Sequence, residues 1–573
     1  MKTNRVIKIF LASSEELEAD RYRFGNLIRK LDNIYEKRGI RIELFEWEDY
    51  DAAYNGMRKQ DEYNERVRAS DMFLALFHKK AGKFTIEEFN IARKAFDEQA
   101  SPKIYTYIKD LEAGESESRE LAEFKRLMLE ELGHYWCRYS NFDTMQLHFV
   151  LQLQMIEATT PIKVEIKESQ VKIGDSTIAD LNNVPFTSEN ATHRELQSRK
   201  EQLDREIGNA ESGGRRGFFG QRSRTTDEEL ANLREERESV TEQIERQEKA
   251  LVDTAMSIAR MQGGECSSRM RTAAELFEKG EIDKAEAVLK EDDMEADATN
   301  AKLKFDTAAQ PTAELTRNIE RCAGEYMLKA RIVVSGIADE SRYRQAVKLM
   351  STAIDLISGR LPEETLAEYL FDYAVLLTDA GQQTKALETW ERLSGIYERL
   401  YRKAPQKYAY GYAGVLNNMA VLYSDKGDFD HCLSKYLKAV DIYDWLDREE
   451  PGIYDDDIAR LKNNLGTLYS DRDEYNKALS EFNEAARIRF ELLAKDNDPD
   501  SRSALADIYC NMATALQFSD HPQEALRYIA QAHAILDELD KEFPRIYEYK
   551  LYPILNREGS ILSLIHISEP TRP

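Results

Sequence analysis

Short apolar runs alternate with amphipathic stretches over about the first 157 residues of the chain. Strands that are covered on both faces of a parallel sheet lack polar alternation, so the apolar runs predict buried strands at 6–12, 41–47, 72–78, 103–108 and 135–140. The periodic stretches predict helices at about 15–37, 59–69, 85–97, 117–133 and 144–158. This alternation indicates an α/β domain with a parallel sheet over residues 1–158.

The pattern changes twice after this domain. Polar and apolar residues alternate in "IKVEIKESQVKIGD" (162–175), which predicts a small β-hairpin in a linker of residues 159–188. Residues 189–262 are heavily charged and contain few Gly or Pro outside the segment 213–226, which we expect to form a turn. Their thin apolar stripe predicts an antiparallel coiled-coil hairpin and consists of Leu196, Leu203, Leu233, Val240 and Leu251.

From residue 263 the chain repeats a helical pattern. "NMAVLYSDKGDFDHCLSKYLKAV" and "NLGTLYSDRDEYNKALSEFNEAA" align without gaps, and two further segments fit the same frame. Small residues at two fixed positions let paired helices approach closely, while large residues fill the space between them. The small positions hold Ala374, Ala420, Gly466 and Ala513 in the first helices, and Ala386, Cys432, Ala478 and Ala525 in the second.

This frame resembles the tetratricopeptide repeat (TPR), with 46 or 47 residues between equivalent positions in place of the usual 34. The resemblance implies an all-α solenoid over 263–561, with weaker copies at 346–353 and 275–289. It also implies a protein or peptide ligand on the concave surface of the solenoid.

Two columns of the first helices bear on that ligand. One column consists of amide side chains: Asn418, Asn464 and Asn511. These amides either line a concave groove that binds the ligand or have a structural role, which is the alternative because asparagine is common at this repeat position. The other stands where repeats that clamp a terminal carboxylate carry Asn, and it holds Val421, Thr467 and Thr514. We therefore do not expect a clamp for a C-terminal peptide.

Charge and cysteine content limit the classes of partner and the cellular compartment that we expect. The formal net charge of −25 argues against nucleic acid or an anionic membrane as the main partner. Five scattered cysteines without paired spacing fit a reducing cytosol, and no apolar run is long enough for a membrane span. We expect a cytoplasmic protein.

The last twelve residues, "LSLIHISEPTRP" (562–573), break the pattern of the repeats. They resemble the conceptual translation of a sequencing adapter. We expect the genomic reading frame to continue past Ile561 with more repeat-like helix.

Polar residues follow the strands of the predicted sheet. Ligands of such sheets gather beyond the carboxyl ends of the strands, and those ends here carry "SSEE" (13–16), "EDYDAA" (48–53) and "KKAGKFTIEE" (79–88). A carboxylate there could stabilise an oxocarbenium-like sugar, as in glycoside hydrolysis. His78 has no partner at metal-ligand spacing, so no metal site is expected.

"IKIFLASSEE", "ELFEWEDY" and "ASDMFLALFHKKAGKFTIEEFNIA" together resemble the TIR-like domains of bacterial multidomain proteins, over about 150 of the 573 residues. The resemblance implies a flavodoxin-like sheet and cleavage of NAD at the nicotinamide–ribose bond, with NAD as substrate and no cofactor. The essential glutamate of the family lies four residues beyond an aromatic residue that is usually Trp. Phe84 takes the aromatic position here, Glu88 takes that of the glutamate, and Glu87 is the alternative by one residue.

The same resemblance implies that Ser13 and Ser14 contact the ribose and phosphates of NAD. Ser13 with Glu16 also spells a capping box, which is a structural alternative. Trp47 either stacks on a base or packs in the core, and with Phe84 and Phe89 it could wall the site.

Three functions remain open. The leading hypothesis is a TIR-like NADase effector in prokaryotic immunity or stress signalling, controlled by the TPR array and assembled as a homo-oligomer through the coiled coil. The second is a non-enzymatic TIR/TPR adaptor for protein–protein interaction. The third is a nucleoside or nucleotide glycosyl-bond hydrolase or transferase.

Overall fold

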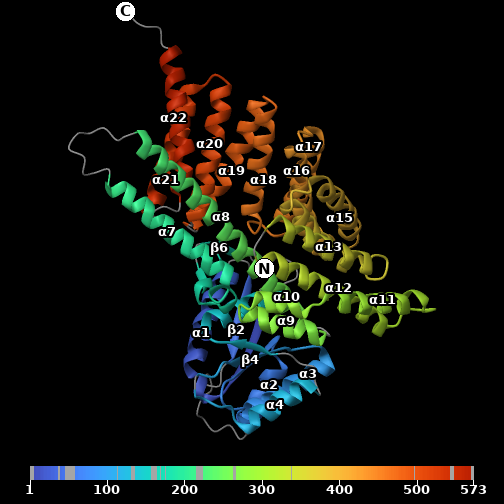
Figure 1. Ribbon diagram of the computed structural model, residues 1–573. Helices are drawn as coiled ribbons and strands as arrows, with labels where there is room; N and C mark the ends of the chain where they lie inside the picture. Colours follow the sequence, from blue (N-terminus) through green and yellow to red (C-terminus); the bar gives the residue numbers. More distant parts are fainter. Residues whose placement is uncertain are drawn as a thin grey trace, which may run out of the picture. The chain divides into compact units, whose positions relative to one another are not determined.

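The computed structural model describes residues 5–568 except 37–38, 46–58, 113, 131–135, 157–163, 168, 174–175, 214–223, 262–265, 337–338, 496, 498 and 543–546. The chain divides into two compact units, Met1–Arg360 and Leu361–Pro573. Helices dominate both units, and the first unit also contains a small parallel sheet (Figure 1). No helix among the described residues is long and apolar enough to cross a membrane.

The sheet of the first unit has the strand order β2-β1-β3-β4-β5, and every neighbouring pair is parallel. The parallel sheet predicted from the apolar runs is therefore confirmed. Its strands are β1 (Arg5–Ser13), β2 (Ile40–Phe45), β3 (Met72–Phe77), β4 (Lys103–Lys109) and β5 (Cys137–Tyr139). Every residue of the central strand β3 is buried, which explains why its sequence lacks polar alternation.

Helices cover both faces of this sheet (Figure 1). On one face, α1 (Glu18–Glu36) and α5 (Phe142–Ile156) pack in a cluster that includes Leu31 and Phe149. The other face is covered by α2 (Lys59–Arg68), α3 (Lys83–Gln99) and α4 (Arg119–Glu130). Aromatic rings fill the core on that side: Phe10, Phe73, Phe77, Phe89 and Phe124.

A second, antiparallel sheet follows the α/β domain. It contains β6 (Glu165–Lys167), β7 (Gln170–Ile173) and β8 (Ser176–Asp180), so a third strand extends the expected hairpin. Ile173 and Ile178 join the core on the α1 and α5 face of the parallel sheet. A short 3-10 turn, Leu181–Asn183, and α6 (Pro185–Ser188) then lead into a long helix pair.

This pair consists of α7 (Ala191–Gly213) and α8 (Arg224–Met261). The helices are antiparallel, because His193 near the start of α7 lies 3.6 Å from Glu248, whereas Asp204, further along α7, accepts at 2.8 Å from Arg237, which precedes Glu248 on α8. Four residues of the predicted stripe pack in the contact together with Ile244: Leu196, Leu203, Leu233 and Val240. These four residues therefore pack within one chain. Of the expected turn at 213–226, residues 214–223 lie outside the described residues, and the residues on either side belong to α7 and α8.

The second half of α8 leaves α7 and packs against α5 and against α12 (Ala313–Ser335). Gln152 on α5 donates to the carbonyl of Ala259 at 3.0 Å, and Arg331 on α12 donates to the carbonyl of Asp253 at 2.9 Å. The remaining helices of this unit are α9 (Ser268–Glu278), α10 (Ile282–Val288), α11 (Glu291–Thr307) and α13 (Glu340–Ile357).

The second unit is an array of helix pairs. The pairs are α14 (Glu363–Asp379) with α15 (Gln383–Lys403), α16 (Pro405–Asp425) with α17 (Phe429–Glu449), α18 (Asp455–Asp471) with α19 (Tyr475–Lys495), and α20 (Pro499–Phe518) with α21 (Pro522–Glu542), followed by α22 (Glu548–Ser568). The predicted C-terminal helical repeat array is confirmed.

The predicted small positions are buried where the paired helices meet. Gly466 shows why the side chain there must be small: an added Cβ would lie 2.6 Å from two ring carbons of Phe482. Gly414 is a contrasting helical glycine, because nothing lies within 4 Å of the Cβ it would carry. Close contact between helices therefore determines the residue type at the first position and leaves it free at the second.

The turns within the pairs share one geometry. The residue at the turn has a positive φ in all four pairs, and it is Gly381, Gly427, Asp473 or Asp520. The backbone N–H of the following residue donates to the carbonyl five residues before it, as from Asp428 to Tyr423. This is the hydrogen-bond pattern of a Schellman motif at a helix C-terminus. Gly280, between α9 and α10, has the same geometry, with φ 76° and a bond from Glu281 to Leu276.

A buried polar cluster lies at the base of the α7–α8 pair. Ser169, in the β6–β7 turn, donates to Oε1 of Glu248 on α8 at 2.5 Å, and Nε2 of His193 on α7 is 3.6 Å from the same oxygen. His193 and Glu248 are no more than 1% exposed. Burial raises the pKa of Glu248 to about 7 and lowers that of His193. Lys200 and Glu245 are the charged neighbours, and their effects on the Glu248 pKa oppose each other.

Substitution of the two contrasting glycines by alanine should have opposite effects. Gly414→Ala should raise the free energy of unfolding by about 0.5–1 kcal/mol, because alanine costs less backbone entropy in a helix. Gly466→Ala should lower it by about 1 kcal/mol or more, because the Cβ meets Phe482. Urea unfolding measures both changes, and equal stabilisation by the two variants would contradict the close contact.

The pKa of Glu248 predicts a pH-dependent stability. The folded state keeps this proton between pH 4.5 and about 7 whereas the unfolded state releases it, so this contribution to stability is lost as pH rises through that range. Glu248→Gln should leave stability unchanged at about pH 5 and raise it at about pH 8, by at most about 3 kcal/mol. Urea unfolding followed by circular dichroism measures the difference.

The exposed Glu238 on the same helix provides the control, because Glu238→Gln should change stability little at either pH. The interpretation of Glu248 as a proton-holding group is wrong if Glu248→Gln has the same effect at both pH values.

Candidate functional site

The loops that follow β1 and β3 meet at the carboxyl edge of the parallel sheet. Oε1 of Glu16 accepts hydrogen bonds from the backbone N–H groups of Lys79 (2.9 Å) and Lys80 (3.2 Å), and from the hydroxyl of Ser14 (3.3 Å). Glu16 therefore accepts hydrogen bonds from the backbone of the β3–α3 loop. The capping-box alternative required Glu16 to accept from the backbone at the start of its own helix instead.

Ser13 and Ser14, the predicted NAD contacts, lie at this edge and are half-buried. Arg21 of α1 donates from one Nη1 atom to the hydroxyl of Ser13 and to the carbonyl of Ser14, both at 2.9 Å. The guanidinium is almost fully buried, at 1% exposure. Both serines thus already serve the packing of α1 against the sheet, a role that the sequence did not reveal.

A second charged network fills the edge beside β4 and β5. Asp20, only 5% exposed, accepts from Nζ of Lys109 at 2.9 Å and from the hydroxyl of Tyr139 at 3.0 Å. Burial and the neighbouring Asp20 raise the pKa of Tyr139, so its hydroxyl remains a donor. Sequence reasoning missed this network, because the three residues are far apart in the chain and join only when α1 crosses the strand ends.

The two candidate glutamates differ in environment. Helix α3 begins at Lys83, and its buried face carries Thr85, Glu88, Phe89, Ala92 and Ala95 at helical spacing. Glu88 is 7% exposed and shares this face with side chains of the aromatic core. Glu87 is half-buried and accepts a hydrogen bond from Nδ2 of Asn64 on α2 at 3.2 Å. Both lie in the second turn of the helix.

The aromatic walls of the predicted site are only partly described. Phe84 is 55% exposed at the start of α3, whereas Phe89 is 1% exposed and packs against Phe73 and Phe124. Trp47 lies outside the described residues. Phe84 is thus exposed at the surface, and Phe89 belongs to the core.

His78, at the end of β3, lies beside a carboxylate. Its Nε2 is 3.3 Å from Glu115, which also pairs with Lys79. The bond from Lys79 lowers the pKa of Glu115. Within the described part of the chain, no group of three or more His, Cys, Asp and Glu side chains is arranged to hold a metal ion.

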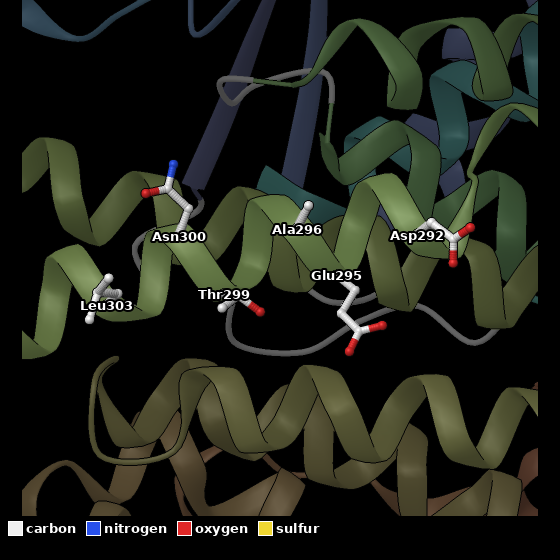
Figure 2. A pocket seen from close by; sticks show the side chains of 6 residues that line it. All are labelled: Asp292, Glu295, Ala296, Thr299, Asn300 and Leu303. Atoms are coloured by element: carbon white, nitrogen blue, oxygen red, sulfur yellow. The ribbon is translucent and has the colours of Figure 1, made fainter.

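A cavity of about 600 Å³ lies away from this sheet edge, along α11 (Figure 2). Its lining side chains follow one face of the helix: Asp292, Glu295, Ala296, Thr299, Asn300 and Leu303. Leu303 is 62% exposed there. The cavity contains none of the residues that the sequence singled out for chemistry.

The amide column of the array joins successive pairs. Nδ2 of Asn464 donates to Oδ1 of Asn417 at 3.4 Å, and Nδ2 of Asn511 donates to Oδ1 of Asn463 at 3.0 Å. These bonds connect α16 to α18 and α18 to α20. Asn464 and Asn511, two of the three predicted column residues, therefore hydrogen-bond to the first helix of the preceding pair. The first helices of these neighbouring pairs lie side by side.

No protein-family model matches the sequence, and no curated protein matches it. Among solved structures, the chain is similar to BtubC (BKLC) from P. vanneervenii, with 19% identity, a TM-score of 0.32 and coverage of 43% of this chain and 92% of that one. It is similar to the apo form of RapI, with 16% identity, a TM-score of 0.35 and coverage of 64% and 86%. It is also similar to aspartyl phosphate phosphatase F from Bacillus subtilis, with 13% identity, a TM-score of 0.34 and coverage of 65% and 83%. All three TM-scores are low.

Proposed function

We propose that the chain is a protein-interaction scaffold whose helical array holds a protein or peptide partner. The observation that carries this proposal is the layer of first helices joined by the Asn417–Asn464 and Asn463–Asn511 bonds. Stacked helix pairs present an extended surface of this kind, and they are commonly used for binding.

We place the binding surface on the first-helix layer, which carries exposed apolar side chains. Val421 on α16 is 40% exposed, and Phe518 at the end of α20 is 66% exposed and stacks on Tyr475 at 6.4 Å between ring centroids. Large apolar residues that remain in water commonly mark interaction sites. The array provides its own comparison, because Phe490 is also 66% exposed but belongs to the second helix α19.

The proposal predicts which surface substitution abolishes partner capture. The double variant Val421→Asp with Phe518→Asp should reduce recovery of a bound protein by about 10-fold or more, because interface energy concentrates in a few apolar anchors. Phe490→Asp should leave recovery unchanged. Affinity purification of the tagged full chain, followed by quantitative mass spectrometry, measures the recovery of bound protein for the wild type, the double variant and Phe490→Asp. Equal loss in Phe490→Asp, or the absence of any enriched partner, would contradict the proposal.

A second proposal concerns the α/β domain, and the burial of Glu88 on α3 supports it. A carboxylate in an apolar setting interacts strongly with a developing positive charge, such as that on the ribose when nicotinamide leaves NAD. In this proposal Glu88 stabilises the ribosyl cation, Phe84 lies beside the ligand, and Glu87 serves the contact between α2 and α3. Adaptor and NADase roles are compatible, since one uses the array and the other the sheet edge.

Nicotinamide release from NAD by the purified chain, with and without its captured partner, tests this second proposal. Glu88→Gln should lower turnover by about 10²-fold or more, because the lost contact is made chiefly in the transition state. Glu87→Gln should keep most of the activity. Because Glu88 is buried, its substitution could also lower activity by destabilising the fold. The comparison therefore requires that both variants have the same thermal unfolding temperature as the wild type.

Three outcomes would change the assignment. An active wild type matched by both variants would remove the glutamates from the mechanism, and loss in Glu87→Gln alone would exchange their roles. Nucleobase release from nucleosides in place of nicotinamide release would favour a nucleoside or nucleotide glycosyl-bond hydrolase or transferase.

A further inference from the structure

A thiol, an imidazole and a phenol meet beneath the edge strand of the parallel sheet, and none of the three belongs to the two proposed sites. Sγ of Cys137 on β5 lies 2.8 Å from Nε2 and 3.4 Å from Nδ1 of His148 on α5. The hydroxyl of Tyr107 on β4 lies 3.2 Å from Nδ1 of the same ring, and the two rings meet edge to face at 5.5 Å.

The topology explains this meeting. Tyr107 and Cys137 are direct partners in the β4–β5 ladder, so their side chains share one face of the sheet. That face is the one covered by α5. His148 lies in the second turn of α5, just beyond the short loop that follows β5, so its ring reaches back to both strand residues.

We propose that Cys137 and His148 form a reactive thiol–imidazole pair, oriented by Tyr107, whose reaction partners are small neutral electrophiles and hydroperoxides. A nucleophile bonded to a base, with that base held by a third group, is the arrangement that activates cysteine. The imidazole takes the thiol proton, its Nε2–H group bonds the thiolate, and its other N–H group donates to the Tyr107 oxygen.

The reaction with a hydroperoxide balances within this pair. The thiolate attacks the outer oxygen, the O–O bond breaks, and sulfur is oxidised to a sulfenic acid. The leaving hydroxide takes a proton from the His148 imidazolium, which forms water from hydrogen peroxide and returns the ring to its neutral state. With iodoacetamide, the same thiolate forms an S–C bond and displaces iodide.

The other thiols of the chain are natural controls. Burial raises the pKa of Cys266 and of Cys322 to about 11, and that of Cys432 and of Cys510 to about 12. Cys322 is the closest match, because it is 2% exposed and Cys137 is 4% exposed. Burial alone therefore cannot explain a difference in reactivity between these two thiols. The half-buried His148 gives the pair an edge toward the surface.

Iodoacetamide alkylation of the native full chain at neutral pH, followed by peptide mass spectrometry, tests the proposal. Cys137 should react at least about 10-fold faster than Cys322, because reactivity follows the thiolate fraction. His148→Gln should slow Cys137 by about 10-fold or more and leave Cys322 unchanged. A Cys137 rate no greater than that of Cys322, or one that is unaffected in His148→Gln, would overturn the proposal.

Two further measurements separate activation from a structural role. Tyr107→Phe removes only the hydroxyl, so it should slow Cys137 while Cys322 still reports an intact unit; an unchanged Cys137 rate would overturn the orienting role. In the wild type, the Cys137 rate should fall less steeply below neutral pH than the Cys322 rate. His148 on α5 and Tyr105 and Tyr107 on β4 are titratable groups that lie beside Cys137, and burial raises the pKa of both tyrosines. Parallel pH profiles for the two thiols would contradict the pair.

Discussion

Helix α8 packs against a different part of the first unit at each stage along its length. Its first half pairs with α7 through a small apolar core, and its middle holds Glu248 against the β6–β7 turn. Its last turns lie between α5 and α12 and accept hydrogen bonds from Gln152 and Arg331. Because packed cores tend to have discrete arrangements, a shift of α8 must be accommodated by the α/β domain and by α12 together.

This constraint connects α8 to the edge of the parallel sheet within the first unit. The edge of the parallel sheet is organised by Arg21, Glu16 and Asp20, all of which come from the loop after β1 or from α1. Helix α1 shares its core with α5, and α5 in turn contacts α8. The Cys137–His148 pair lies under the same α5. Packing changes at α8 therefore have a continuous route of contacts to the sheet edge.

Much of this architecture follows from patterns that are local in the sequence. Short runs rich in apolar residues predict the five strands, and the pairing of small with large residues every 46 or 47 positions predicts the helix pairs. Both signals arise from burial, which residue type records directly. The turn residues Asp473 and Asp520 occupy the positive-φ position that is glycine in the first two pairs, so the geometry is kept although the residue changes.

The partners of the buried polar side chains cannot be predicted from such local sequence patterns. Glu248 belongs to a helix crowded with surface acids, and nothing in its neighbours along the chain distinguishes the one that is buried beside His193. Ser13 could be read as a ligand contact because Arg21, which uses its hydroxyl, is one of many charged residues on α1. Cys137 and His148 meet only through strand pairing and the entry angle of α5. In each case the partner is decided by tertiary packing.

Coupling through α8 is tested most directly by native-state hydrogen exchange of the full chain in rising urea. If α8 ties the α/β domain to the helices that follow, the amides of α5, of residues 244–261 and of α12 should converge on one opening reaction with a common urea dependence. Independent opening, with α5 losing protection at a small urea dependence while α12 remains protected, would contradict this coupling.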